Sequence, residues 1–149
     1  MRAIVVNELG GPEVLALAEQ PAPKPGPGQV IARVAAAGVN FIDIYRRSGV
    51  YQQHVPHIPG REGAGVVSSV GKDVTEFAVG DHVAWAEAAG SYGELVAVDE
   101  REAVPVPPGI DLKVAAAVVL YEIVRQRRAR EASAGSEPDI KPRAKPGPK

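Results

Sequence analysis

The sequence predicts a mainly β (α+β) fold, a partly open β-barrel with one short internal helix and a second helix near its C-terminal end. Glycine and proline make up about a fifth of the 149 residues, with 16 and 14 copies, against roughly 12% in average proteins. Short apolar runs rich in β-branched residues are separated by turn signals about every ten residues, which favours strands. Apolar residues at 45% and charged residues at 23% are typical of a globular chain.

Local patterns place each element along the chain. A proline-rich stretch at 21–28 cannot continue a strand, because proline lacks the backbone donor that a sheet needs. Residues 40–49 predict a short helix that Asn40 can cap and Gly49 ends. Strands are expected at 3–6, 14–18, 29–37, 63–71, 77–85 (a turn, then a strand), 92–98 and 103–106.

Three regions follow from this pattern. Residues 1–110 form the barrel domain, and Asp111 caps a helix over 111–132. Residues 133–149 are expected to be a disordered, basic, proline-rich tail, because no large apolar residue follows Ile140.

Charge and composition exclude several classes of protein. Residues 1–120 hold 9 Lys/Arg and 14 Asp/Glu, whereas residues 121–149 hold 8 and 4, so the overall charge of −1 hides an acidic barrel and a basic end. Without cysteine the chain has no disulfide, no thiolate zinc ligand and no cysteine nucleophile. The longest apolar run, 114–121, is too short to span a bilayer, and the first nine residues do not form a signal peptide. We therefore expect a cytoplasmic protein with no membrane partner.

Two loop segments are candidates for a site. The glycine-rich stretch at 60–65 precedes a strand instead of a helix, which is the wrong context for a phosphate-binding loop. We expect a tight loop with Glu62 buried against backbone amides, or one wall of a cleft. His54, His57 and Glu62 lie in or beside a proline-containing loop and have no convincing zinc spacing, so no metal site is predicted.

Several hydrogen-bonding side chains lie in and just after the predicted short helix: Asn40, Asp43, Tyr45, Arg47 and Tyr51. Capping by Asn40 and a solvated polar face explain this spacing. Alternatively, Tyr45 and Tyr51 offer flat apolar faces with a phenol tip to a planar ring. The spacing alone leaves both interpretations open. No Ser-His-Asp arrangement, paired-carboxylate layout or P-loop is present.

Five segments taken together resemble a known family. They are GPEVL at 11–15, GVNFID at 38–43 running on to residue 51, PGREGAGVV at 59–67, VGDHV at 79–83 and YGE at 92–94. In this order and spacing they resemble the N-terminal domain of the NADPH:quinone oxidoreductases, the zeta-crystallin-like, zinc-free branch of the medium-chain dehydrogenases/reductases. The resemblance covers residues 1 to about 120 and implies a GroES-like, alcohol dehydrogenase-like β-barrel.

The resemblance also implies a chemistry and a set of site residues. In the zinc-dependent relatives a cysteine stands at the position of Asn40 and a histidine at that of Arg61, and neither an amide nor a guanidinium suits zinc. A zinc-independent oxidoreductase that transfers hydride from NADPH to a quinone or an activated alkene is therefore implied. The positions that match the family's cofactor contacts are Asn40, Phe41, Asp43 and Tyr45. Tyr45 and Tyr51 match catalytic positions, with Tyr51 lining the quinone cleft as a ring-stacking or proton-supplying group.

The resemblance stops near Leu120, where the family continues into a Rossmann domain with a glycine-rich pyrophosphate loop. No G-x-G-x-x-G at a strand-to-helix junction occurs in this sequence. The expectation is a truncated N-terminal domain of a quinone oxidoreductase, inactive alone. The apolar face of the helix at 114–124 is a predicted association surface, so a homo-oligomer is expected.

Two alternatives stay open at this point. One is an enoyl or alkenal reductase of the same superfamily. The other is a non-enzymatic GroES-like module whose basic tail binds nucleic acid or a partner protein. Four acidic residues among the eight basic ones at 121–149 argue against nucleic acid.

Overall fold

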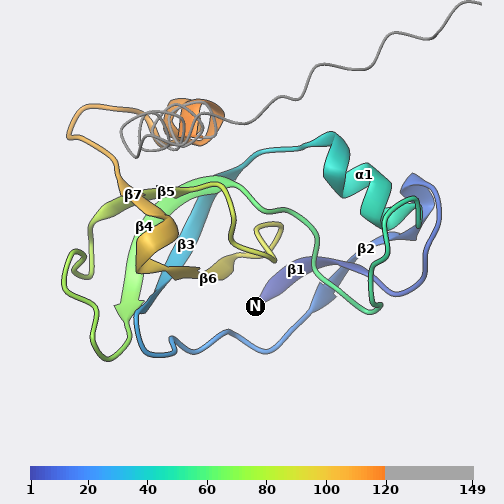
Figure 1. Ribbon diagram of the computed structural model, residues 1–149, viewed down its shortest axis with the longest axis horizontal. Coiled ribbons are helices and arrows are strands. Elements are labelled where there is room, and N and C mark those ends of the chain that lie inside the picture. The colour runs from blue at the N-terminus through green and yellow to red at the C-terminus, as the bar shows by residue number, and fades with distance from the viewer. Residues whose placement is uncertain (120–149) are drawn as a thin grey trace, which may run out of the picture.

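The computed structural model describes residues 1–119, which form a mainly β domain with a curled, partly open sheet (Figure 1). This confirms the predicted fold class. The main sheet has the antiparallel strand order β6–β3–β4–β5–β7, and β1 pairs with β2 in a separate ribbon. The strands are β1 Arg2–Val6, β2 Leu15–Glu19, β3 Gln29–Ala37, β4 Gly63–Val70, β5 His82–Trp85, β6 Leu95–Asp99 and β7 Ala103–Pro105. The helical elements are the 3-10 turns η1 (Pro12–Val14) and η2 (Glu100–Glu102), the helix α1 (Phe41–Arg47), and a helix beginning at residue 112 that is described to residue 119.

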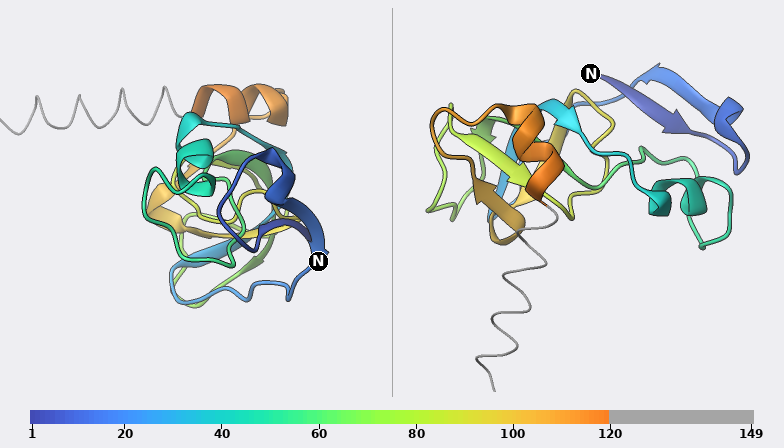
Figure 2. Two further views of the ribbon diagram at one scale, coloured as in Figure 1. Left: turned by 90° about the vertical axis from the view of Figure 1, so that its right-hand side faces the viewer. Right: turned by 90° about the horizontal axis from the view of Figure 1, so that it is seen from above.

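Strand β5 is buried on both of its faces. Val83 and Trp85 face the interior of the curl, where they join a cluster with Val30, Ala32, Val67, Phe77, Ala88, Val96 and Val98. Ala84 faces the opposite way and packs with Ala64 and Ala86 against the helix that begins at residue 112. Figure 2 shows this helix lying across the strands. Small alanines on the helix side let the helix approach the sheet closely.

Close strand contact also explains one glycine of the 60–65 segment. Gly65 on β4 lies opposite Val34 of β3, and a Cβ on Gly65 would meet the backbone carbonyl oxygen of Arg33. Register shifts in β3 occur on either side of this point. Gly65 therefore serves strand pairing, and the segment has no helix after it that could hold a phosphate.

The β1–β2 ribbon is tied to loops instead of to the edge of the main sheet. The Val6 N–H donates to the carbonyl of His57 at 2.9 Å, and the His57 N–H donates back at 3.1 Å. A second bridge joins Ala3 to Gly93. Ribbon and α1 consequently lie together at one end of the molecule (Figures 1 and 2).

Several sequence-based boundaries shift in the structure. The strand expected at 92–98 begins only at Leu95, because Tyr92 and Gly93 belong to a loop that bonds to residues 59–60 and to β1. The strand expected at 14–18 begins at Leu15, after the 3-10 turn that Pro12 opens. The end of the helix predicted at 111–132 and the tail predicted at 133–149 lie outside the described residues. The boundary expected at residue 110 stays a prediction.

Candidate functional site

Two loops that run side by side frame the site. The Ala88 N–H donates to the Arg61 carbonyl at 2.9 Å, Gly90 N–H to the Gly60 carbonyl at 3.1 Å, and Tyr92 N–H to the Pro59 carbonyl at 3.0 Å. Gly60 has a φ of +85°, and a Cβ there would collide with the Tyr92 ring, so only glycine fits this crossing. Gly60, Arg61 and Glu62 line cavities, in agreement with the predicted cleft wall, whereas the rest of the segment belongs to β4.

Glu62 in this wall is buried, as expected, but its surroundings differ from the prediction. Its carboxylate lies against the backbone of Gly38, and a Cβ on residue 38 would collide with it. Within residues 1–119 no backbone amide donates to this carboxylate, so the predicted contacts with amides are wrong. The backbone N–H of Gly38 donates instead to the backbone carbonyl of Glu62, at 3.1 Å.

The opposite wall is α1, whose position depends on Asp43. Asn40 occupies the N-cap position, and its N–H donates to Asp43 Oδ2 at 3.0 Å. The same oxygen accepts a hydrogen bond from the Tyr92 hydroxyl at 3.0 Å. Asp43 is only 8% exposed and is the buried residue of this seven-residue helix. A charged hydrogen bond therefore fastens α1 to a loop 49 residues further along the chain.

This contact changes the chemistry of the tyrosine. Burial, followed by the negative charge of Asp43, raises the pKa of Tyr92 above its ordinary value. Tyr92 is consequently a neutral hydrogen-bond donor at physiological pH.

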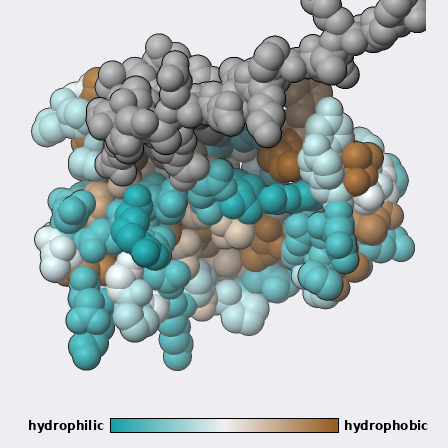
Figure 3. Space-filling view, viewed as in Figure 1, coloured by the Kyte–Doolittle hydropathy of each residue, from teal (hydrophilic) through white to brown (hydrophobic). Residues whose placement is uncertain are grey.

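The aromatic side chains of α1 and of the segment after it form an exposed row. The rings of Phe41 and Tyr45 stack with centroids 6.3 Å apart, and Tyr45 meets Tyr51 edge-on at 5.5 Å. Phe41 is 74% exposed and Tyr51 is 50% exposed. Figure 3 shows hydrophobic residues among polar ones at this end of the molecule. The pattern of Phe41 and Tyr45 on one helical face therefore presents apolar rings to the surface instead of filling the core.

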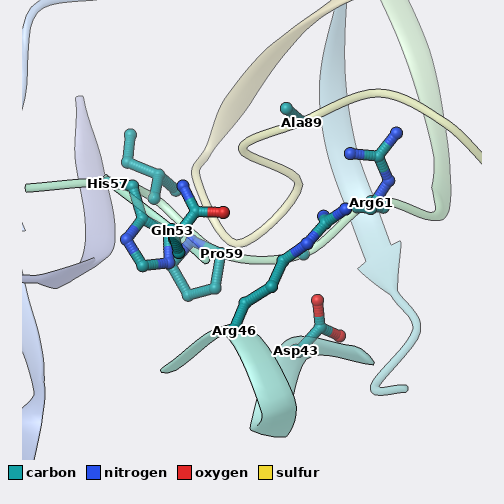
Figure 4. A pocket seen from close by; sticks show the side chains of 9 residues that line it. Asp43, Arg46, Gln53, His57, Pro59, Arg61 and Ala89 are labelled. Atoms are coloured by element: carbon teal, nitrogen blue, oxygen red, sulfur yellow. The ribbon is translucent and has the colours of Figure 1, made fainter. Parts of the chain in front are cut away.

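Two of the cavities between α1 and the framing loops are lined by both Arg46 and Arg61. The first, which we call the Arg46 pocket, has a volume of about 230 Å³ (Figure 4). Its lining includes Asp43, Arg46, Gln53, His57, Pro59 and Arg61. The second, which we call the Phe41 pocket, has a volume of about 440 Å³. Its lining includes Asn40, Phe41, Arg46, Arg61, Glu62 and Glu87. Arg46 and Arg61 line both pockets, so the two cavities meet at these side chains.

The basic groups in these cavities have different partners. Arg61 pairs with Glu87, with its Nε donating to Oε2 at 3.0 Å. Burial lowers the pKa of His57, and the charge of Arg46 lowers it further against an opposing hydrogen bond to the His54 backbone. His57 is therefore neutral at pH 7, and its Nδ1 is buried without a partner among residues 1–119.

The structure brings most of the predicted site residues to one end of the domain. Asn40 and Phe41 line the Phe41 pocket, and Asp43 lines the Arg46 pocket, while their roles as cofactor contacts stay predictions. Tyr45 and Tyr51 line neither pocket and stand beside them in the aromatic row. Their expected roles as cofactor contacts and catalytic groups stay predictions.

Sequence reasoning missed Arg46, Tyr92 and Glu87 as parts of this site. A signal existed for Arg46, because it follows Asp43 by three positions and so shares its helix face. No local pattern indicates that Tyr92 or Glu87 folds back onto residues 43 and 61.

Comparisons with known proteins place this geometry in a family. A family model described as the alcohol dehydrogenase GroES-like domain matches residues 26–108, more than half of the chain. The chain belongs to this family. The GroES-like domain is 46% identical over 126 residues to a quinone oxidoreductase of Pseudomonas aeruginosa, covering 82% of this chain and 38% of that protein.

Solved structures support the same assignment. The GroES-like domain superposes on mycobacterial Rv1454c complexed with NADPH with a TM-score of 0.80 and 38% identity, covering 93% of this chain and 42% of that one. For the Escherichia coli quinone oxidoreductase complexed with NADPH the TM-score is 0.78 at 34% identity, with 85% and 41% covered. The resemblance to the quinone oxidoreductases is therefore confirmed. The chain spans about two fifths of the length of these relatives.

Residues 1–119 contain no group of three or more His, Asp or Glu placed to hold a metal ion. Over the same residues, no helix combines the length and the apolar character that a bilayer crossing requires.

Proposed function

We propose that this GroES-like domain is the acceptor-binding part of an NADPH-dependent quinone oxidoreductase and is inactive alone. The observation that carries the proposal is the exposed row of Phe41, Tyr45 and Tyr51 beside the Phe41 pocket. A planar ligand that covers large exposed apolar rings lowers the free energy by burying them, and aromatic pairs prefer centroid distances of about 4.5–7 Å. The identity of 46% to a quinone oxidoreductase supports a quinone as that ligand.

Reduction of a quinone to a hydroquinone consumes one hydride and one proton. NADPH supplies the hydride when it is bound. The task of this chain is to hold the ring and to supply the proton, and Tyr51 carries both roles because its phenol is exposed at the end of the aromatic row. Tyr45 lies between Phe41 and Tyr51 and orients both rings.

The residues present fit the nicotinamide end of the cofactor. Asn40 and Phe41 line a cavity of about 440 Å³ and offer an amide and a flat ring, which suit a carboxamide-bearing heterocycle. Asp43 holds the helix on which they stand through its bond to the Asn40 N–H. No glycine-rich loop between a strand and a helix occurs in the sequence to bind the pyrophosphate. We therefore expect weak NADPH binding by this chain alone.

The chemistry is proposed to be independent of zinc. Asn40 and Arg61 occupy the wall of the Phe41 pocket. A guanidinium has no lone pair for a metal, and a neutral amide oxygen is a poor zinc ligand. Glu87 on the wall of this cavity is already paired with Arg61.

Binding of 2-methyl-1,4-naphthoquinone to the 149-residue chain tests the acceptor site. In NMR titrations we expect shifts of the Tyr45 and Tyr51 resonances and weaker binding by Tyr51→Ala, because the ring loses its stacking partner. Val79→Ala removes another exposed apolar side chain, which lies on the β4–β5 connection, so it serves as the control. Equal loss of binding in both variants would contradict the proposed site.

Further measurements test the remaining parts of the proposal. The chain alone should show no NADPH-dependent quinone reduction and no tight NADPH binding in calorimetry, and a clear tight-binding isotherm would refute the claim of inactivity. Competition by an α,β-unsaturated ketone stronger than that by the quinone would favour an alkenal reductase instead.

The predicted homo-oligomer is testable by size-exclusion chromatography, with Val114 and Val118 as exposed apolar residues of the C-terminal helix.

A further inference from the structure

Arg46 is a charged side chain that lines the cleft. It lies in the last turn of α1, is half-buried, and lines both cavities. Figure 4 shows it extending from the helix into the Arg46 pocket, between His57 and Gln53 on one side and Arg61 on the other. Among residues 1–119, no carboxylate pairs with its guanidinium. An anionic ligand stabilises a positive charge that is held in a partly desolvated position.

The Arg46 pocket offers one guanidinium to an anion. Among residues 1–119 Arg46 has no carboxylate partner, whereas Arg61 is paired with Glu87 and Asp43 adds one negative charge to the lining. Asp43 Oδ2 already accepts hydrogen bonds from the Asn40 N–H and the Tyr92 hydroxyl. His57 adds no charge at pH 7, because burial lowers its pKa, but it and Gln53 add hydrogen-bonding groups.

The Phe41 pocket differs in charge and in shape. Its two arginines are balanced by Glu62 and Glu87, and Glu87 is paired with Arg61. It is also the larger cavity and has the exposed Phe41 ring on its wall. A planar acceptor ring stacked on Phe41 would therefore lie near Arg46 and Arg61, which line the same cavity.

We propose that Arg46, with Arg61, forms an anion subsite that makes this cleft selective for aromatic acceptors carrying a carboxylate or sulfonate. The guanidinium of Arg46 binds the anionic group, and the acceptor ring lies against Phe41 of the aromatic row, beside the nicotinamide site in the Phe41 pocket. Arg46 is thus a specificity-determining residue. This inference rests on the proposed function, because it assumes that the ring is the hydride acceptor.

A matched pair of ligands tests the subsite with the full 149-residue chain. We would measure binding of 9,10-anthraquinone-2-carboxylate and of its neutral carboxamide by NMR. The carboxylate should bind about tenfold more tightly than the amide, which corresponds to one charge-assisted hydrogen bond at a half-exposed site. Arg46→Gln should remove this preference, whereas Arg33→Gln should keep it. Arg33 is exposed on β3 and is absent from the lining of both pockets, so it controls for net charge.

The outcomes separate the subsite from the proposed function. Equal affinities for the carboxylate and the amide would overturn the subsite and leave acceptor binding intact. Binding of neither compound would overturn both proposals. If Arg46→Gln fails to fold, the wild-type chain still decides, because raising the ionic strength from about 0.02 M to about 0.5 M should reduce the preference. A preference that salt leaves unchanged would refute the ionic origin.

The nucleotide offers a second source for an anion at this place. Reduced nicotinamide mononucleotide combines a planar ring with one phosphate and therefore serves as the competing probe. We expect it to leave the anthraquinone carboxylate bound at equimolar concentration. Efficient displacement that Arg46→Gln abolishes would assign the subsite to the cofactor's phosphate and overturn its assignment to the acceptor.

Discussion

Removal of the Tyr92 hydroxyl should destabilise the domain by detaching α1 from the framing loops. In Tyr92→Phe the ring stays packed against Gly60, while Asp43 loses one of its two hydrogen bonds. A hydrogen bond to a charged group contributes about 1.5–3 kcal/mol. Because the Asn40 N–H still serves Asp43, we expect a loss near the lower end, about 1.5 kcal/mol.

Urea unfolding at pH 7 measures this loss. Trp85 is the only tryptophan and is fully buried, so its fluorescence reports the unfolding of the sheet. With a denaturant slope of about 1.5 kcal/mol/M, the midpoint should fall by about 1 M. Tyr51→Phe is the control, because the Tyr51 hydroxyl has no hydrogen-bond partner among residues 1–119, and its effect should stay within about 0.5 kcal/mol.

Two results would refute this reasoning. One is a midpoint for Tyr92→Phe no lower than that for Tyr51→Phe. The other is additivity of Tyr92→Phe with Asp43→Ala, since a shared hydrogen bond requires a coupling energy between the two positions. The pH dependence gives a further check: the raised pKa of Tyr92 stabilises the fold below pH 10, and this contribution is lost at higher pH in the wild type only.

Three other predictions follow from the packing. Because the pKa of His57 is lowered in the fold, the unfolded chain binds the proton more readily, and stability should fall as the pH drops below about 6.5. The urea midpoints at pH 7 and pH 5 should therefore differ less in His57→Gln than in the wild type. His82→Gln, a control at an exposed position, should retain the wild-type difference. Gly65→Ala should cost about 1–3 kcal/mol in urea unfolding because its Cβ would meet a backbone carbonyl of β3, and wild-type stability would contradict the strand geometry. Ser91→Ala should cost about 1–3 kcal/mol and change the emission of native Trp85, whose indole N–H donates to the Ser91 hydroxyl at 2.9 Å; an unchanged spectrum and midpoint would contradict that bond.

The fold could be predicted from local signals in the sequence. Each long strand is an apolar, β-branched run closed by glycine or proline, and the cap at Asn40 and the stop at Gly49 bound α1 to within two residues. The prediction failed where a residue's partner lies far along the chain. Tyr92 reads as the start of a strand, but its bonds to Pro59 and Asp43 hold it in a loop.

The site was only partly predictable for a related reason. Asn40, Phe41 and Asp43 stand on one short helix, so their spacing already placed them together. The other wall comes from loops whose backbone bonds join Arg61 to Ala88 and Gly60 to Gly90, and no periodicity encodes such a pairing. Asp43 is also acidic, and its burial depends on a tyrosine that the local sequence does not reveal.

The bridges from the first strand carry a consequence for mutational scanning. Val6 is fully buried and exchanges two hydrogen bonds with His57, which lines the Arg46 pocket. The Ile4 N–H donates to the carbonyl of Tyr92, whose side chain holds α1. A library screened for altered ligand affinity should therefore return substitutions among the first six residues, none of which lines the cleft. Libraries restricted to cleft-lining positions would overlook these variants.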